Sequence, residues 1–118
     1  MTSALRSVSI EALLDSLGAK QPVPGGGAAA GITASLGIAA ARMVLAYSVG
    51  RPELSEHEAS NVEAMSQLDS WKDASLALAE ADAQAFERLS TLWKLPEDDP
   101  ARTAEWDAAV RGAIEPPL

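Results

Sequence analysis

The sequence predicts an all-α protein, a helical bundle with one long helix. Alanine, the residue with the highest helix propensity, is abundant in the 118 residues, and aromatic residues account for only 4%. Few segments show the alternation of β-branched and polar residues that is typical of strands. A chain of this length fits one domain at most, with a core of limited size. We therefore expect residues 1–118 to belong to a single helical domain.

The composition excludes several classes of site. Cysteine is absent, which rules out disulfides and thiolate metal ligands, and His57 is the only histidine, which rules out a centre with several histidine ligands. We expect no metal. The formal net charge of −8 argues against nonspecific binding to nucleic acid or to an anionic membrane. Residues 1–12 contain charged residues and no apolar core, so no signal peptide is expected. A cytoplasmic location follows as the expectation.

Residues 7–17 are expected to form a short amphipathic helix. Either Ser7 or Ser9 can cap its start, and Gly18 is a natural stop. Its apolar residues recur at near-helical spacing: Val8, Ile10, Leu13, Leu14 and Leu17.

A loop with a demanding shape follows at residues 21–27. Two prolines restrict it, and three consecutive glycines permit backbone angles that other residues avoid. The amides that open the next helix, together with the helix dipole, are suited to an anion, a carbonyl or a polar heterocycle edge. The alternative is a tight turn that lets helices pack closely. Neither the phosphate-binding loop of nucleoside triphosphatases nor the dinucleotide fingerprint matches.

Residues 28–48 predict a second helix, which ends before Gly50. Gly27, Gly31 and Ser35 fall four apart on one side, so a neighbouring helix can approach closely. The helix is apolar, but Arg42 lies inside it and would be costly within a membrane. We expect a buried helix and no membrane span, with Arg42 snorkelling or paired structurally. The alternative is that Arg42, like Lys20, meets an anionic ligand.

Residues 53–94 contain no proline or glycine and predict one helix about 60 Å long, with a break left open. Asp82 lies on an otherwise apolar stripe of this helix, where a carboxylate is partly desolvated and needs a partner, a ligand or a proton. A salt bridge or an exposed position at the stripe's edge is the alternative to a functional role. The other members of the stripe are Ala79, Phe86, Leu89 and Trp93.

A fourth helix is expected over residues 103–114. Asp99 is placed to cap it and Pro100 to occupy the first helical position. The three tryptophans, Trp71, Trp93 and Trp106, are interpreted as core or interface residues.

Taken together, these segments resemble the formiminotransferase-cyclodeaminase and methenyltetrahydrofolate cyclohydrolase family. The matching pieces are the first helix, the Pro-Val-Pro-Gly-Gly-Gly element at 22–27, the small-residue helix ending near 42–44, the Glu-Ala-Asp-Ala-Gln-Ala-Phe element at 80–86, Leu-Pro at 95–96 and the terminal residues 113–118. The resemblance implies an all-α domain that usually forms a homodimer. It also implies that residues 1–118 are the N-terminal portion of an incomplete family domain.

The resemblance further implies a folate enzyme, either a cyclohydrolase (a hydrolase) or a cyclodeaminase (a lyase). A tetrahydrofolate derivative is then the substrate, and Asp82 the catalytic residue, as a proton relay or an anchor for the pterin. The implied substrate-binding residues are Pro24, Gly25, Gly26, Gly27, Lys20 and Phe86. The alternative is a truncated, non-catalytic helical interaction module of the same ancestry, whose apolar stripe serves a partner chain.

Overall fold

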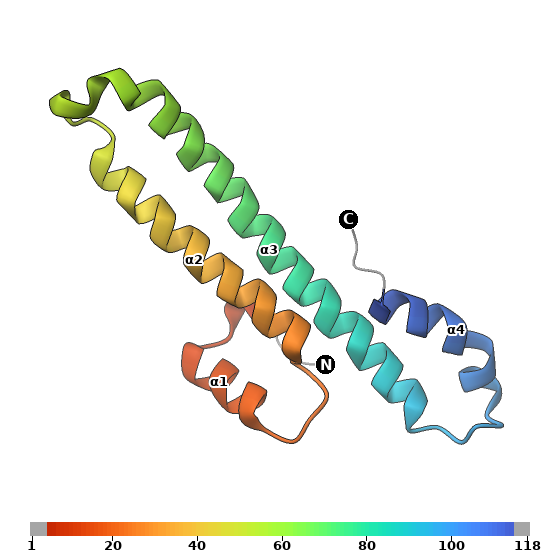
Figure 1. Ribbon diagram of the computed structural model, residues 1–118. Coiled ribbons are helices and arrows are strands. Elements are labelled where there is room, and N and C mark those ends of the chain that lie inside the picture. The colour runs from red at the N-terminus through yellow and green to blue at the C-terminus, as the bar shows by residue number, and fades with distance from the viewer. Residues whose placement is uncertain (1–4, 115–118) are drawn as a thin grey trace. The chain divides into compact units, whose positions relative to one another are not determined.

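A computed structural model describes residues 5–114 of the chain, which are helical and contain no strand. The all-α prediction is confirmed. The terminal motif residues 115–118 lie outside the described residues. In order along the chain the elements are a 3-10 helix η1 (Leu5–Ser7), α1 (Ile10–Gly18), α2 (Gly26–Ser48), a second 3-10 helix η2 (Pro52–His57), α3 (Glu58–Trp93) and α4 (Pro100–Ile114) (Figure 1).

Two helices start at the caps that the sequence predicts. The Ser9 hydroxyl accepts a hydrogen bond from the Ala12 amide at 3.0 Å at the start of α1. Asp99 Oδ1 accepts one from the Ala101 amide at 2.9 Å, with Pro100 as the first residue of α4. The helix therefore begins at Pro100 rather than at residue 103, because cap and proline together fix its start.

The long helix is shorter than residues 53–94. The backbone angles of Leu54, φ −114° and ψ 16°, are not those of an α-helix. Residues 52–57 therefore form the separate 3-10 helix η2 instead of the first turns of α3. Between α2 and η2, Gly50 adopts a φ of 84°, which favours glycine. Its amide donates to both carboxylate oxygens of Glu58, at 3.1 and 3.0 Å. The turn is thus tied to the first residue of α3.

The chain divides into two compact units. The first comprises Met1–Ala30 and Leu78–Leu118, and the second comprises Gly31–Ala77, so α2 and α3 each contribute to both. The buried apolar residues of the described chain all belong to the first unit, and most are small: Ala28, Ala79, Leu92 and Ala109. Small side chains at these positions let the helix backbones come close together.

Within the first unit, the predicted apolar stripe of α3 is only partly buried. Phe86 is 42% exposed and Trp93 65% exposed, whereas Ala79 is buried, as is Leu92 beside the stripe. For Trp93, the α3–α4 turn accounts for the exposure. Trp93 meets Trp106 only edge to face, at 5.7 Å between ring centroids. The guanidinium of Arg102 lies over the ring of Trp106, 4.6 Å from its centroid, and donates to the Leu95 carbonyl at 2.9 Å.

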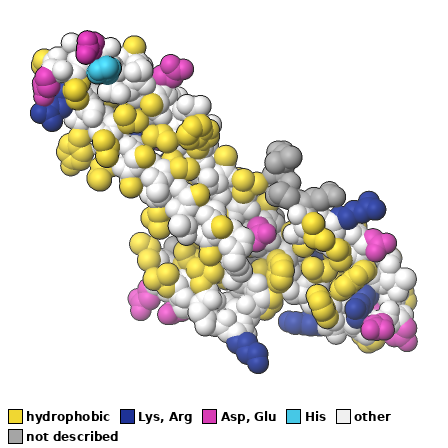
Figure 2. Space-filling view, in the orientation of Figure 1, with side chains coloured by type: hydrophobic (Ala, Val, Ile, Leu, Met, Phe, Trp, Pro, Cys, Tyr) yellow, Lys and Arg dark blue, Asp and Glu magenta, His cyan; other side chains and the backbone are white. Residues whose placement is uncertain are grey.

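The second unit is a helical hairpin made of residues 31–48 of α2 and 58–77 of α3. The prediction that α2 is buried is wrong, because one side of it faces outward. The apolar residues on that side form what we call the α2 stripe: Leu36, Met43, Val44 and Tyr47, which are 67, 55, 61 and 75% exposed. Figure 2 shows hydrophobic side chains gathered on the surface of this hairpin. By length and composition alone, α2 also meets the criteria for a membrane-crossing helix.

Candidate functional site

The glycine loop is braced by a glutamine that precedes it. The Gln21 side-chain amide donates to the Ser16 carbonyl at 3.3 Å and to the Val23 carbonyl at 3.0 Å. The end of α1 and the approach to α2 are thereby tied together. Pro24 and Gly25 complete the loop and are half-buried, and the Val23–Pro24 peptide bond is cis. The proline- and glycine-rich loop is thus a hydrogen-bonded connection between α1 and α2.

Of the two features that the sequence indicates for the glycines, unusual backbone angles and a close approach of a neighbouring helix, the structure shows the second, at Gly27. Gly25, Gly26 and Gly27 do not adopt a positive φ, so the expectation of unusual backbone angles is wrong. Instead, Gly26 and Gly27 are the first two residues of α2. A Cβ on Gly26 would meet nothing within 4 Å, and one on Gly25 would meet the Pro22 carbonyl oxygen at 3.3 Å. At Gly27, by contrast, the structure leaves no room for a side chain.

Gly27 lies directly against the side chain of Asp82. A Cβ built on Gly27 would stand 2.5 Å from Asp82 Oδ2 and 2.6 Å from both Oδ1 and Cγ. Real Cβ atoms do not come so close to other heavy atoms, so the carboxylate occupies the volume that a side chain at residue 27 would need. The structure therefore brings together two of the predicted site residues, which are 55 positions apart in the sequence.

Asp82 is half-buried and has no hydrogen-bond or ion-pair partner within residues 5–114. A neighbouring carboxylate on α3 differs in this respect. Glu80 Oε1 accepts a hydrogen bond from the Arg6 amide at 3.0 Å and lies 3.6 Å from the Arg6 Nε. Arg6 thus neutralises Glu80 and leaves the charge of Asp82 uncompensated. Of the two alternatives for Asp82, the salt bridge is excluded within the described chain.

Backbone donors lie beside this carboxylate. The Ala29 amide donates to the Gly25 carbonyl at 3.0 Å, which is the first hydrogen bond of α2. The amides of residues 26–28 precede it and have no intrahelical acceptor. A carboxylate at a helix N-terminus interacts favourably with the helix dipole. The arrangement combines an acceptor that can bind N–H groups or take a proton with donors that can bind a carbonyl oxygen.

Two further predicted substrate-binding residues, Lys20 and Phe86, are not held in the contact between Gly27 and Asp82. Lys20 is exposed, and no hydrogen bond or ion pair joins it to the glycine loop in the part of the chain that is described. Phe86 lies one helical turn after Asp82 and keeps 42% of its surface exposed. It is positioned on the same side of α3 as Asp82. Lys20 and Phe86 remain predictions as substrate-binding residues.

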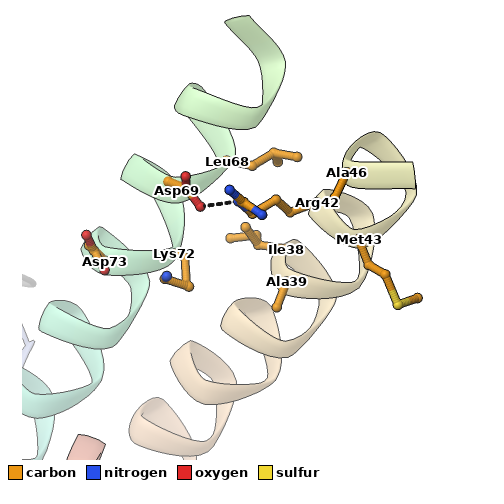
Figure 3. A pocket seen from close by; sticks show the side chains of 9 residues that line it. All are labelled: Ile38, Ala39, Arg42, Met43, Ala46, Leu68, Asp69, Lys72 and Asp73. Atoms are coloured by element: carbon orange, nitrogen blue, oxygen red, sulfur yellow. Dashed lines mark ion pairs between the residues drawn. The ribbon is translucent and has the colours of Figure 1, made fainter. Parts of the chain in front are cut away.

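A second candidate is an open groove of about 780 Å³ between α2 and α3 in the second unit (Figure 3). Arg42 Nε lies 2.6 Å from Asp69 Oδ1, which confirms the structural pairing weighed for this arginine. Lys72 and Asp73 also line the groove. Its two cations are matched by two carboxylates, so it has no net charge with which to attract an anionic ligand.

Sequence reasoning missed the contact of Gly27 with Asp82 and the pair of Arg6 with Glu80. One signal for the first contact was present in the sequence. In an antiparallel pair of helices, residues about equally far from the connecting segment face each other, and residue 27 lies 21 residues before the end of α2 while residue 82 lies 24 residues after the start of α3. Within the described chain, no group of three or more histidine or carboxylate side chains is placed to hold a metal ion.

Comparison with known proteins identifies the family. Residues 9–118 match the formiminotransferase-cyclodeaminase family. The methenyltetrahydrofolate cyclohydrolase of Methylorubrum extorquens is 30% identical over 114 residues, which cover 93% of this chain and 55% of that protein. The formimidoyltransferase-cyclodeaminases of Rattus norvegicus and Sus scrofa are 29% and 31% identical, over 98% and 86% of this chain but only 22% and 20% of their own lengths.

The chain thus spans about half the length of the cyclohydrolase and about a fifth of the two longer enzymes. The match includes the glycine loop and the aspartate helix, the two elements that meet at Gly27 and Asp82. The chain belongs to the formiminotransferase-cyclodeaminase family.

Proposed function

We propose that this chain is part of a folate-dependent one-carbon enzyme, either a methenyltetrahydrofolate cyclohydrolase or a formiminotetrahydrofolate cyclodeaminase. Relatives that carry these names match it over most of its length. The observation that carries the proposal is the Asp82 carboxylate, which lies beside Gly27 at the first turn of α2 and has no partner within residues 5–114. The substrate is a tetrahydrofolate derivative, and no metal is required.

The chemistry of both reactions suits this arrangement. Each passes through a tetrahedral carbon between two nitrogens of the folate. The methenyl group carries a delocalised positive charge, and a carboxylate without a cationic partner attracts such a group more strongly than a neutralised one does. As a proton relay, Asp82 accepts a proton from the attacking water in the hydrolysis, or passes one to the departing nitrogen in the release of ammonia. As an anchor, it instead holds the N–H donors of the pterin ring. The free amides of α2 are available to a pterin carbonyl.

The test follows the loss of the methenyltetrahydrofolate chromophore with the purified chain. Ammonia release from formiminotetrahydrofolate is measured in parallel to separate the two reactions. If Asp82 relays a proton, Asp82→Asn lowers kcat by about 10²- to 10⁴-fold, whereas a pterin anchor raises KM instead. Asp73→Asn is the matched control, because Asp73 is an exposed carboxylate on the same helix. An Asp82→Asn variant as active as wild type contradicts the proposal, as does wild type without activity.

A second candidate function is favoured by the α2 stripe. Four large apolar side chains on one face of a helix, each more than half exposed, are typical of a surface that contacts another chain. The alternative is a non-catalytic helical interaction module, and for either function we propose a homodimer. Sedimentation of the folded chain together with the activity assay separates the two functions. Activity refutes the module, whereas association without turnover favours it.

We also propose that the protein works in the cytoplasm and not within a membrane. The pairing of Arg42 with Asp69 supports this, because the charged pair lies across the centre of the hairpin and is partly exposed, at 39% and 44% of the two side chains. Fractionation of cells that express a tagged chain is the test. Recovery in the membrane pellet after a carbonate wash contradicts the proposal.

A further inference from the structure

The absence of a side chain at Gly27 leaves room for the carboxylate of Asp82. The two residues meet within the first unit, at the point where α2 begins. A Cβ at residue 27 would lie 2.5–2.6 Å from three atoms of the aspartate side chain. Because Gly27 has no positive φ, alanine fits its backbone conformation without strain. The space taken by Asp82 is therefore what opposes a larger residue there.

Nothing else within residues 5–114 fixes the position of the Asp82 carboxylate. It has no hydrogen bond and no ion pair, in contrast to Glu80 on the same helix. Its placement follows from the rotamer of a short side chain and from contact with the α2 backbone at Gly27. An added methyl group would force the carboxylate to rotate away, because the contacting atoms are the free end of a side chain.

We infer that Gly27 is a positioning residue, which leaves room for the Asp82 carboxylate against the first turn of α2 and so lets it lie where the substrate needs it. The functional part of this inference rests on the proposed function. The steric part does not, and can be tested by itself. Gly27 has this role although it contributes no functional group, and Gly26 does not share it, since a Cβ there meets nothing within 4 Å.

The steric part is tested with a cycle of four proteins: wild type, Gly27→Ala, Asp82→Ala and the double variant. Thermal unfolding is followed by circular dichroism. In the Asp82→Ala background, Gly27→Ala raises the Tm by up to about 4 °C, because the space is empty and alanine favours the helix. In wild type the same change raises the Tm less or lowers it, because the Asp82 side chain has to be displaced.

The difference between the Tm changes in the two backgrounds is the diagnostic result. Gly26→Ala is the control in the same helical turn, and its effect on the Tm is the same with and without Asp82. If Gly27→Ala changes the Tm equally in both backgrounds, the inference is overturned, whatever the catalytic activity of the chain.

The functional part is tested by kinetics in the folate assay. Gly27→Ala alters whichever parameter Asp82→Asn alters, kcat or KM, by about 10²-fold, because a displaced group about 1 Å from its place loses most of its effect. Gly37→Ala is the control, since it also lies in α2, has open space around it and is remote in sequence from the loop. A folded Gly27→Ala variant with full activity overturns the inference and leaves the proposed function intact. Inactive wild type overturns the proposed function, and the Tm cycle still decides the steric part.

Discussion

Removing the ion pair between Arg42 and Asp69 tests how the hairpin of the second unit is held together. The Nε of Arg42 lies 2.6 Å from Oδ1 of Asp69, in a groove that is also lined by apolar residues and by the charged residues Lys72 and Asp73. The informative changes are Arg42→Met, which keeps most of the aliphatic stem, and Asp69→Asn, which keeps the shape of the carboxylate. Together with the double variant they form a double-mutant cycle.

The expected coupling is modest because water reaches the pair. The two side chains are 39% and 44% exposed, so solvent screens their attraction. Exposed pairs contribute about 0.2–1 kcal/mol, and we place this one near the upper end, at about 0.5–1 kcal/mol, because its geometry is close. In a domain of this size that corresponds to a change of roughly 2–6 °C in Tm.

Urea unfolding followed by circular dichroism measures the coupling free energy, first at low salt and then in about 1 M NaCl, where screening is nearly complete. The coupling falls as salt is added. Asp73→Asn serves as the control, since Asp73 lines the same groove and has no hydrogen-bond or ion-pair partner within the described residues. A coupling of zero at low salt refutes the assignment of Arg42 as a structural cation, and leaves it available to a ligand in the groove.

Two further predictions concern other parts of the chain. Asp99→Ala removes the acceptor of the Ala101 amide and lowers the free energy of unfolding by about 1 kcal/mol, whereas Asp99→Ser keeps most of that stability. Urea unfolding measures both variants. An alanine variant as stable as wild type contradicts the capping role. Tyr47→Lys places a charge on the α2 stripe and shifts the protein toward monomer in sedimentation velocity. The control, Glu53→Lys, changes an exposed polar position and causes no such shift. An equal shift in both variants argues against the stripe as an interface.

Local features of the fold could be predicted from the sequence because they depend on neighbouring residues. Ser9 and Asp99 cap the helices that they were expected to cap, since a capping side chain acts on amides two or three residues away. The sequence allows a break in the long helix but does not place it at Leu54, and it does not predict the exposure of Trp93. Both depend on how the turns around α3 close, which is a property of tertiary packing.

The candidate site was predicted residue by residue but not as an arrangement. Asp82 and Gly27 were singled out separately, and their contact depends on the register between α2 and α3. The partner of Arg42 depends on the same register. For the glycines, the sequence indicates both special backbone angles and a close approach of a neighbouring helix, and the structure requires only the empty space, at residue 27. Glycine permits both, and sequence alone does not separate them.

The most direct test of the central claim is to locate folate binding on the chain. Amide chemical shifts of the labelled protein are followed while 5-formyltetrahydrofolate, a stable folate, is added. The account predicts that the amides of Gly26, Gly27 and Ala28 and the residues around Asp82 shift together, and that Asp82→Asn weakens these shifts. Shifts confined to the groove at Arg42 and Lys72, with the first turn of α2 unaffected, would contradict the account.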